Sequence, residues 1–150
     1  MSDGQQKKTF VVTRFDPDKD EVPRQQSYEI WVEDDWKVLD ALNFIKDEVD
    51  PTLSHRWSCR MAVCGSCGMM VNGEPRLTCK DALSDYGDTV EVAPLANFPV
   101  VRDLVIEAEG FMEKLKHVKP WIIRAKERAV EEGPVRQSPS ELEEFKQFSM

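Results

Sequence analysis

Long hydrophobic runs are missing from this 150-residue sequence. No apolar run approaches the roughly 18 residues that a transmembrane helix needs, and the segment from Met1 to Lys8 is polar. We therefore expect neither direct membrane insertion nor secretion through an N-terminal signal peptide. Positive charge is also scarce, since 20 lysines and arginines face 28 aspartates and glutamates for a net charge of −8. A field of this sign repels phosphate backbones, so the composition predicts no nucleic-acid partner.

Histidine is rare as well, with only His55 and His117. The sequence pattern gives these two residues and the scattered carboxylates no arrangement of nucleophile, base and orienting partner, and no glycine-rich loop that cradles phosphate. We expect no substrate chemistry on this chain. A content of 41% hydrophobic and 32% charged residues excludes collagen-like, low-complexity and wholly disordered chains.

Two strands are predicted near the N-terminus. β-branched and aromatic residues alternate with polar ones over residues 9–15 and 27–32, which is typical of antiparallel, half-buried neighbours. The acidic segment 16–20 between them starts like a calcium loop, but Glu21 and Ser27 replace the glycine and the closing glutamate that such a loop requires. We interpret the segment as a solvated turn.

A helix, a hairpin and a last strand follow. Residues 36–49 carry apolar side chains at helical spacing, and the stripe runs through Val38, Leu42, Ile45 and Val49. An Asn-Gly pair inside residues 68–79 predicts a two-residue hairpin turn, and residues 89–95 have the pattern of a short strand. These elements describe an α+β fold in which one helix covers a small mixed sheet.

The C-terminal part has a helical pattern. A stripe of apolar residues predicts a second helix packed as core: Leu104, Ala108, Phe111, Met112, Leu115 and Val118. The segment 138–141 forms a capping box that opens a further helix through Phe145 and Phe148. Because that helix has no chain left to cover its apolar side, we expect a truncated chain whose residues beyond about Ala125 are flexible on their own.

All four cysteines lie in one short stretch, at Cys59, Cys64, Cys67 and Cys79. The first three have the C-x4-C-x2-C spacing of plant-type [2Fe-2S] proteins. If Asn72 and Gly73 form a two-residue turn, strand pairing brings Cys79 back next to Cys67, since cross-strand neighbours are about 5 Å apart. The hairpin therefore lets four thiolates converge on one site.

Other uses of the cysteines are weaker. A zinc site usually has two separate C-x2-C knuckles, whereas this sequence has one. A disulfide framework is typical of secreted chains, and a thioredoxin-like pair needs a βαβ context that the pattern lacks. Small residues at 65, 66 and 68 allow backbone N–H groups to approach the sulfurs of an anionic cluster. A local excess of cations surrounds the cysteines: His55, Arg56, Arg60, Arg76 and Lys80.

Residues 56–69 resemble the [2Fe-2S] loop of the iron-sulfur subunit of succinate dehydrogenase and fumarate reductase, and are closer to the fumarate reductase type. The resemblance continues through the Asn-Gly pair, residues 97–105, residues 119–121 and the C-terminal residues 145–149. It covers nearly the whole chain, and all four ligand positions of the family are cysteine here.

This resemblance implies a β-grasp, [2Fe-2S] ferredoxin-like domain over residues 1–102. Cys59 and Cys64 would hold one iron, and Cys67 and Cys79 the other. Residues 103–150 would be a helical linker and the start of a missing helical ferredoxin domain, which alone would carry the family's [4Fe-4S] and [3Fe-4S] clusters.

The implied function is electron transfer. The subunit would pass electrons between a FAD-bearing flavoprotein subunit and further clusters leading to quinone, held by membrane-anchor subunits at the cytoplasmic face of the membrane. Two alternatives stay open at this point: a free-standing [2Fe-2S] ferredoxin shuttle and a zinc-stabilised interaction module.

Overall fold

The computed structural model describes residues 5–121, 123, 131, 133, 134 and 136–147. It contains two compact units, which divide between Lys114 and Leu115. The first unit holds the sheet and all four cysteines. The predicted division into domains at residue 102 remains a prediction.

The two N-terminal strands form a long antiparallel hairpin, as predicted. Strand β1 (Gln5–Arg14) pairs along its whole length with β2 (Arg24–Glu33), so both strands are longer than the alternating pattern indicated. Phe10 and Val12 are fully buried on one face of β1, and Tyr28, Ile30 and Val32 are buried on the same face of β2. The period of two therefore places one face of the hairpin in the core.

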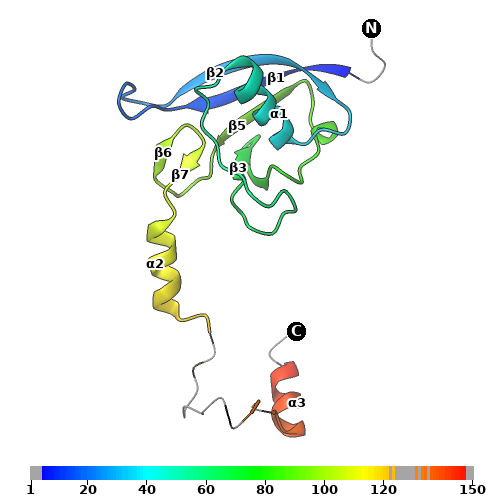
Figure 1. The fold of residues 1–150 in the computed structure, drawn as a ribbon, viewed down its shortest axis with the longest axis vertical. Coiled ribbons are helices and arrows are strands. Elements are labelled where there is room, and N and C mark those ends of the chain that lie inside the picture. The colour runs from blue at the N-terminus through cyan, green and yellow to red at the C-terminus, as the bar shows by residue number, and fades with distance from the viewer. Residues whose placement is uncertain (1–4, 122, 124–130, 132, 135, 148–150) are drawn as a thin grey trace. The chain divides into compact units, whose positions relative to one another are not determined.

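The sheet is mixed. Its strand order is β2-β1-β5-β3-β4, with β5 (Thr89–Pro94) parallel to β1 and antiparallel to β3 (Gly68–Val71). Strand β4 (Glu74–Leu77) closes the far edge. Figure 1 shows α1 (Val38–Phe44) crossing one face of this sheet. The α+β, β-grasp arrangement expected from the sequence is thereby confirmed.

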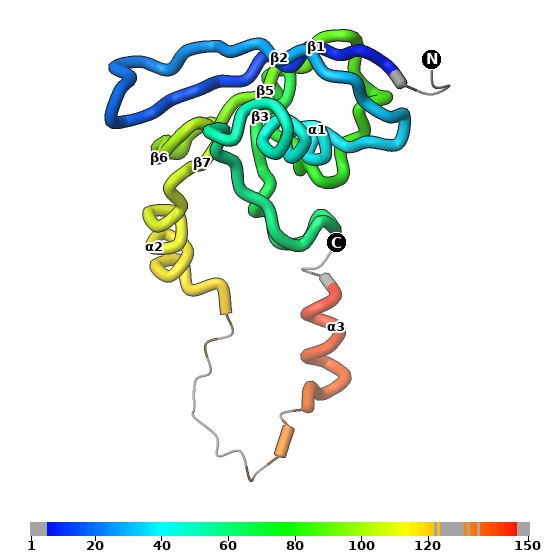
Figure 2. Tube along the Cα trace, turned by 45° about the horizontal axis from the view of Figure 1, so that its top comes forward, coloured from blue at the N-terminus to red at the C-terminus, as the bar shows by residue number. Residues whose placement is uncertain are grey.

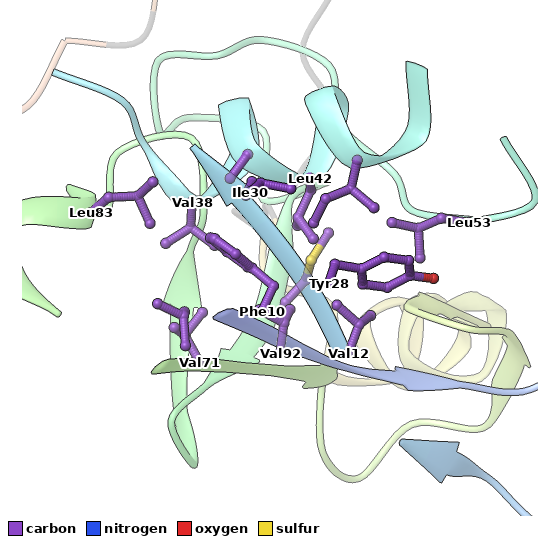
Figure 3. Close-up of a cluster of buried hydrophobic side chains, with 14 of the residues drawn as sticks. Phe10, Val12, Tyr28, Ile30, Val38, Leu42, Leu53, Val71, Leu83 and Val92 are labelled. Carbon is purple, nitrogen blue, oxygen red and sulfur yellow. The ribbon is translucent and has the colours of Figure 1, made fainter. Parts of the chain in front are cut away.

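The core lies between α1 and the sheet. Figure 3 shows Val38 and Leu42 of the helix above Phe10, Val12 and other strand residues. Two further leucines complete the core. Leu53 lies in the segment before the cysteines and is 0% exposed, and Leu83 lies before β5 and is 1% exposed. A short 3-10 helix, η2 (Leu83–Asp85), supplies the second of these residues.

The helix predicted over residues 36–49 changes character part-way. After α1, the chain continues as a π-helix, η1 (Ile45–Val49), in which the Asp50 amide donates to the Ile45 carbonyl. Val38, Leu42 and Ile45 are fully buried, but Val49 is 50% exposed, so its predicted place in the apolar stripe is wrong. A π turn holds more residues than an α turn and rotates Val49 off the buried side.

The stripe starting at Leu104 was predicted to be one core-packed helix, and this prediction is wrong. Residues 100–106 form a small hairpin of β6 (Val100–Arg102) and β7 (Val105–Ile106), and the helix α2 (Glu109–Val118) begins only after it. Leu104 is buried within the turn, whereas α2 has no buried residue. The left-handed backbone of Asp103, with φ of 46°, is incompatible with a helix at that point.

The predicted capping box is confirmed in α3 (Pro139–Gln147) of the second unit. The Glu141 amide donates to Ser138 Oγ at 3.3 Å, and Glu141 Oε2 accepts from the Ser138 amide at 2.7 Å. Leu142 and Phe145 are 43% and 63% exposed. The predictions for residues 125–130 and for Phe148 lie outside the described residues. No helix in the described part of the chain is long and apolar enough to cross a membrane.

Candidate metal centre

The hairpin of β3 and β4 brings Cys79 back to the other cysteines, in the register that the sequence predicts. Val71 faces Glu74 and Gly68 faces Leu77. Asn72 and Gly73 have φ of 47° and 82°, the left-handed pair of a type I′ turn. Directly beyond the last strand pair, the buried Thr78 binds the Cys67 carbonyl through its amide at 3.2 Å and its hydroxyl at 3.0 Å. These two hydrogen bonds to one carbonyl place Cys79 beside Cys67.

The remaining two cysteines lie in the loop between η1 and β3. Figure 2 shows this loop, in teal to green, projecting beyond the end of α1. Its backbone enters the left-handed region at three points, Arg60, Ala62 and Gly65, with φ of 57°, 57° and 74°. Only the last is a glycine, and such conformations cost about 1 kcal/mol or more at other residues. Alternation of this kind turns successive N–H groups toward a common anion.

Those N–H groups point at sulfur. The amides of Met61 and Cys64 both donate to Cys59 Sγ at 3.4 Å. Gly68 donates to the Gly65 carbonyl at 3.0 Å, and a Cβ at Gly68 would lie 3.2 Å from that oxygen. Of the small residues predicted to admit backbone donors to sulfur, Ser66 supplies one to Cys64, whereas Gly68 permits a close approach of two main-chain segments.

The four thiols interact with one another. Cys64 interacts with Cys59, and Cys79 interacts with both Cys67 and Cys59. The Ser66 hydroxyl, together with backbone donors, lowers the pKa of Cys64 to about 6, whereas burial and the neighbouring Cys67 raise the pKa of Cys79. Cys67 is buried, Cys59 and Cys79 are partly buried, and Cys64 is exposed. One edge of the site therefore faces solvent.

The N–H donors bear on the kind of metal. Backbone donors to the thiolate sulfurs stabilise the negative charge of an iron-sulfur cluster. The four interacting thiols, with two amides donating to Cys59 Sγ, fit this chemistry. In the described part of the chain, no three His, Cys, Asp or Glu side chains are grouped as ligands of a single metal ion.

The predicted excess of cations around the cysteines is only partly present. Burial lowers the pKa of His55 to about 4, so this side chain is neutral at physiological pH and its predicted place among the cations is wrong. Arg60 stacks on Trp57 at 4.7 Å and Arg76 binds Glu74. Arg56 and Lys80 are exposed.

An apolar groove borders the loop at Cys64. Its floor and walls include Cys64, Gly65, Leu104, Phe111 and Met112. Phe111 also packs against Phe98, with ring centroids 6.0 Å apart. The groove therefore connects the exposed cysteine with the apolar side of α2.

The model of the 2Fe-2S iron-sulfur cluster binding domain matches residues 9–113. The chain belongs to this family. The match includes all four cysteines and ends within α2. The description of the family agrees with the C-x4-C-x2-C spacing of the first three cysteines.

Similar proteins carry consistent names. The chain is 52% identical over 140 residues to the fumarate reductase iron-sulfur subunit of Mycobacterium tuberculosis, covering 93% of this chain and 57% of the relative. It is 47% identical over 138 residues to that subunit of Escherichia coli O6:H1, covering 92% and 56%. A chain of the Mycobacterium smegmatis Sdh1 complex in the apo form has a TM-score of 0.78 at 29% identity, covering 95% of this chain and 58% of that one.

These similarities confirm the predicted resemblance to the iron-sulfur subunits of fumarate reductase and succinate dehydrogenase. The chain spans a little over half the length of the relatives that it matches.

Proposed function

We propose that Cys59, Cys64, Cys67 and Cys79 hold a [2Fe-2S] centre, with the first two on one iron and the last two on the other. The observation that carries this proposal is the convergence of four interacting thiols, with N–H donors at sulfur, within a family defined by such a cluster. When bound, a centre of this kind accepts and releases single electrons. The chain is then an electron-transfer subunit of a fumarate reductase or succinate dehydrogenase complex.

The surrounding residues suit that task. Amides of Met61 and Cys64 stabilise negative charge on Cys59 sulfur, and the Ser66 hydroxyl does the same at Cys64. Cys67 is shielded from water while Cys64 is exposed, so the site has a protected side and an accessible side. Electrons can enter or leave through the accessible side without passing through the core.

We place a FAD-bearing flavoprotein subunit, where succinate and fumarate interconvert, against the exposed loop. Trp57, Met61 and Val63 are 44%, 70% and 77% exposed there, and Arg56 and Arg60 add positive charge to an acidic chain. The exposed apolar side of α2 also fits a subunit held in a complex better than a free shuttle.

The rest of the electron path belongs to the same proposal. Further [4Fe-4S] and [3Fe-4S] clusters lie in the part of the relatives' length that this chain does not span, and they lead to quinone through membrane-anchor subunits. The complex is peripheral at the cytoplasmic face of the membrane.

Metal analysis tests the proposal. After anaerobic purification we expect about two irons and two acid-labile sulfides per chain. Cys64→Ala should lose the cluster, because it removes a ligand from an exposed position without opening a cavity in the core. Met61→Ala is the matched control, since it changes the same loop but keeps the backbone donor to Cys59. Near-stoichiometric zinc without sulfide, or a normal cluster in Cys64→Ala, would contradict the ligand assignment.

A further inference from the structure

We propose that Asp103 is a positioning residue for the cysteine loop. Its carboxylate holds the backbone of Ser54, where the loop begins, and so sets how the loop presents its thiols to the cluster. This inference rests on the proposed function, because it concerns the way in which the chain holds that cluster.

The carboxylate of Asp103 lies between the end of β1 and the start of the loop. Its side chain is 3% exposed. Oδ1 accepts hydrogen bonds from Arg14 Nε at 2.9 Å and from the Phe15 amide at 3.0 Å, and Oδ2 accepts one from the Ser54 amide at 2.8 Å. Three donors from two distant segments thus converge on one buried carboxylate.

Main-chain hydrogen bonds reinforce this junction. The Asp103 amide donates to the Phe15 carbonyl at 2.8 Å, and the Leu104 amide donates to the Ser54 carbonyl at 3.1 Å. Asp103 itself has φ of 46°, a left-handed conformation that is held because its neighbours determine it. The turn between β6 and β7 is therefore fixed to β1 and to Ser54 at once.

A displacement at Ser54 reaches the cysteines because the following segment has no regular structure of its own. Residues 54–59 form neither helix nor strand. The next side-chain hydrogen bond along this segment joins His55 Nε2 and Asn43 Oδ1 at 2.8 Å. The far end of the loop is fixed separately, by Thr78 on the Cys67 carbonyl. Asp103 thus controls the end that leads to Cys59 and its N–H donors.

The same turn also contacts the middle of the loop. Leu104 is 2% exposed and lines the groove that contains Cys64, Gly65 and Ser66. A shift of the turn would therefore act on the loop at two places.

Asp103→Asn isolates the contact. Asparagine tolerates the left-handed backbone, but its amide has one acceptor oxygen instead of two. Because Oδ1 serves two donors, one of them cationic, we expect the oxygen to stay there and the NH2 group to face the Ser54 amide. The contact with the loop is then the one that is lost.

Asp50→Asn is the matched control. Asp50 Oδ2 accepts from Arg14 Nη1 at 2.7 Å, so the same substitution removes a carboxylate from the same cation. The hydrogen bonds of its side chain to the segment before the loop stop at Thr52 and do not reach Ser54. Asp103→Glu is a second variant that keeps the charge beside Arg14 but displaces the carboxylate from Ser54.

The measurements are made on the full chain with its cluster. Asp103→Asn should change the EPR line shape of the reduced centre, shift its midpoint potential and release iron to a chelator roughly tenfold faster, the factor expected for one charge-assisted hydrogen bond. Asp103→Glu should shift the same signals. Asp50→Asn should keep the wild-type spectrum and potential while unfolding at lower urea concentration.

Wild-type spectra in the Asp103 variants that assemble, or equal shifts in Asp50→Asn, would overturn the positioning role and leave the proposed function standing. A wild-type chain that binds neither iron nor sulfide would overturn the proposed function itself.

Discussion

Arg14 is the residue around which the end of the sheet is organised. Its side chain is 5% exposed, and its donors reach Asp103, Asp50 and Tyr28 at 2.9, 2.7 and 2.6 Å. Burial opposes the charge, but hydrogen bonds with the two carboxylates outweigh it and raise the pKa of Arg14 above its usual range. A buried cation is costly unless carboxylates compensate its charge.

The pH dependence of stability at Asp50 follows from this. Burial works against ionisation, but hydrogen bonds from Thr52, Tyr28 and Arg14 outweigh it and hold the pKa of Asp50 well below its usual range. A lowered pKa in the folded state means that the stabilisation is fully present above the unfolded pKa of about 4 and is lost as pH falls below it.

We therefore predict that Asp50→Asn costs on the order of 2 kcal/mol of unfolding free energy at neutral pH, with a difference from wild type that shrinks below about pH 4. Urea unfolding of both chains across this range measures it. A difference that is constant with pH would contradict the assigned ionisation.

Sequence reasoning found the four cysteines but not the residues that hold their loop. The C-x4-C-x2-C spacing is local and has a direct chemical meaning. Arg14 and Asp103 are 89 positions apart, and neither belongs to a periodic pattern that would predict their contact. The neutral state of His55 could not be predicted either, because it depends first on burial, to which the nearby Lys46 adds.

At the scale of elements, a prediction from the sequence is correct where local geometry alone determines the structure. The hairpin of β3 and β4 was predicted in register, because an Asn-Gly turn fixes the pairing. The helix over residues 36–49 was predicted in place, but its π segment was not, since apolar spacing does not distinguish α from π turns. The prediction of a helix starting at Leu104 is wrong, because the tertiary contacts of Asp103 determine the backbone there despite the helical spacing of the apolar residues.

The hairpin turn gives a test at this scale. Gly73 has φ of 82°, and a Cβ added there would meet open space, so any cost of Gly73→Ala comes from backbone conformation and not from a clash. We predict a loss of about 1 kcal/mol in unfolding free energy, and a smaller loss for Gly73→Asn.

Gly87→Ala is the control for this pair. A Cβ there also meets open space, and Gly87 is not in the left-handed region, so the substitution should be neutral or slightly stabilising. Chemical unfolding of the three variants decides the matter. Equal effects at Gly73 and Gly87 would show that the type I′ turn does not constrain the hairpin.

On the scale of the whole molecule, the buried apolar residues and the exposed apolar residues lie on different elements. The sheet and α1 enclose a continuous core, whereas α2 exposes Phe111, Met112 and Leu115 by 53%, 53% and 40%. Exposed apolar residues grouped on one helix are typical of an interface. A net charge of −8 favours solubility of the rest of the surface.

Leu115→Glu tests whether this side of α2 binds a partner. Because Leu115 is 40% exposed on a helix with no buried residue, the unfolding free energy should change by no more than about 0.5 kcal/mol. Recovery of partner subunits by co-purification from the native source should fall sharply. Val22→Glu, at a residue 70% exposed in the turn between β1 and β2, is the control and should leave recovery unchanged. Equal recovery with both variants would place the interface elsewhere.

The most direct test of the central claim is a reductive titration of the purified chain, followed by EPR. A [2Fe-2S] centre on Cys59, Cys64, Cys67 and Cys79 should take up about one electron per chain and give a paramagnetic signal that integrates to about one spin. Uptake of about two electrons without a signal, as a dithiol–disulfide couple would show, or no uptake at all, would contradict it.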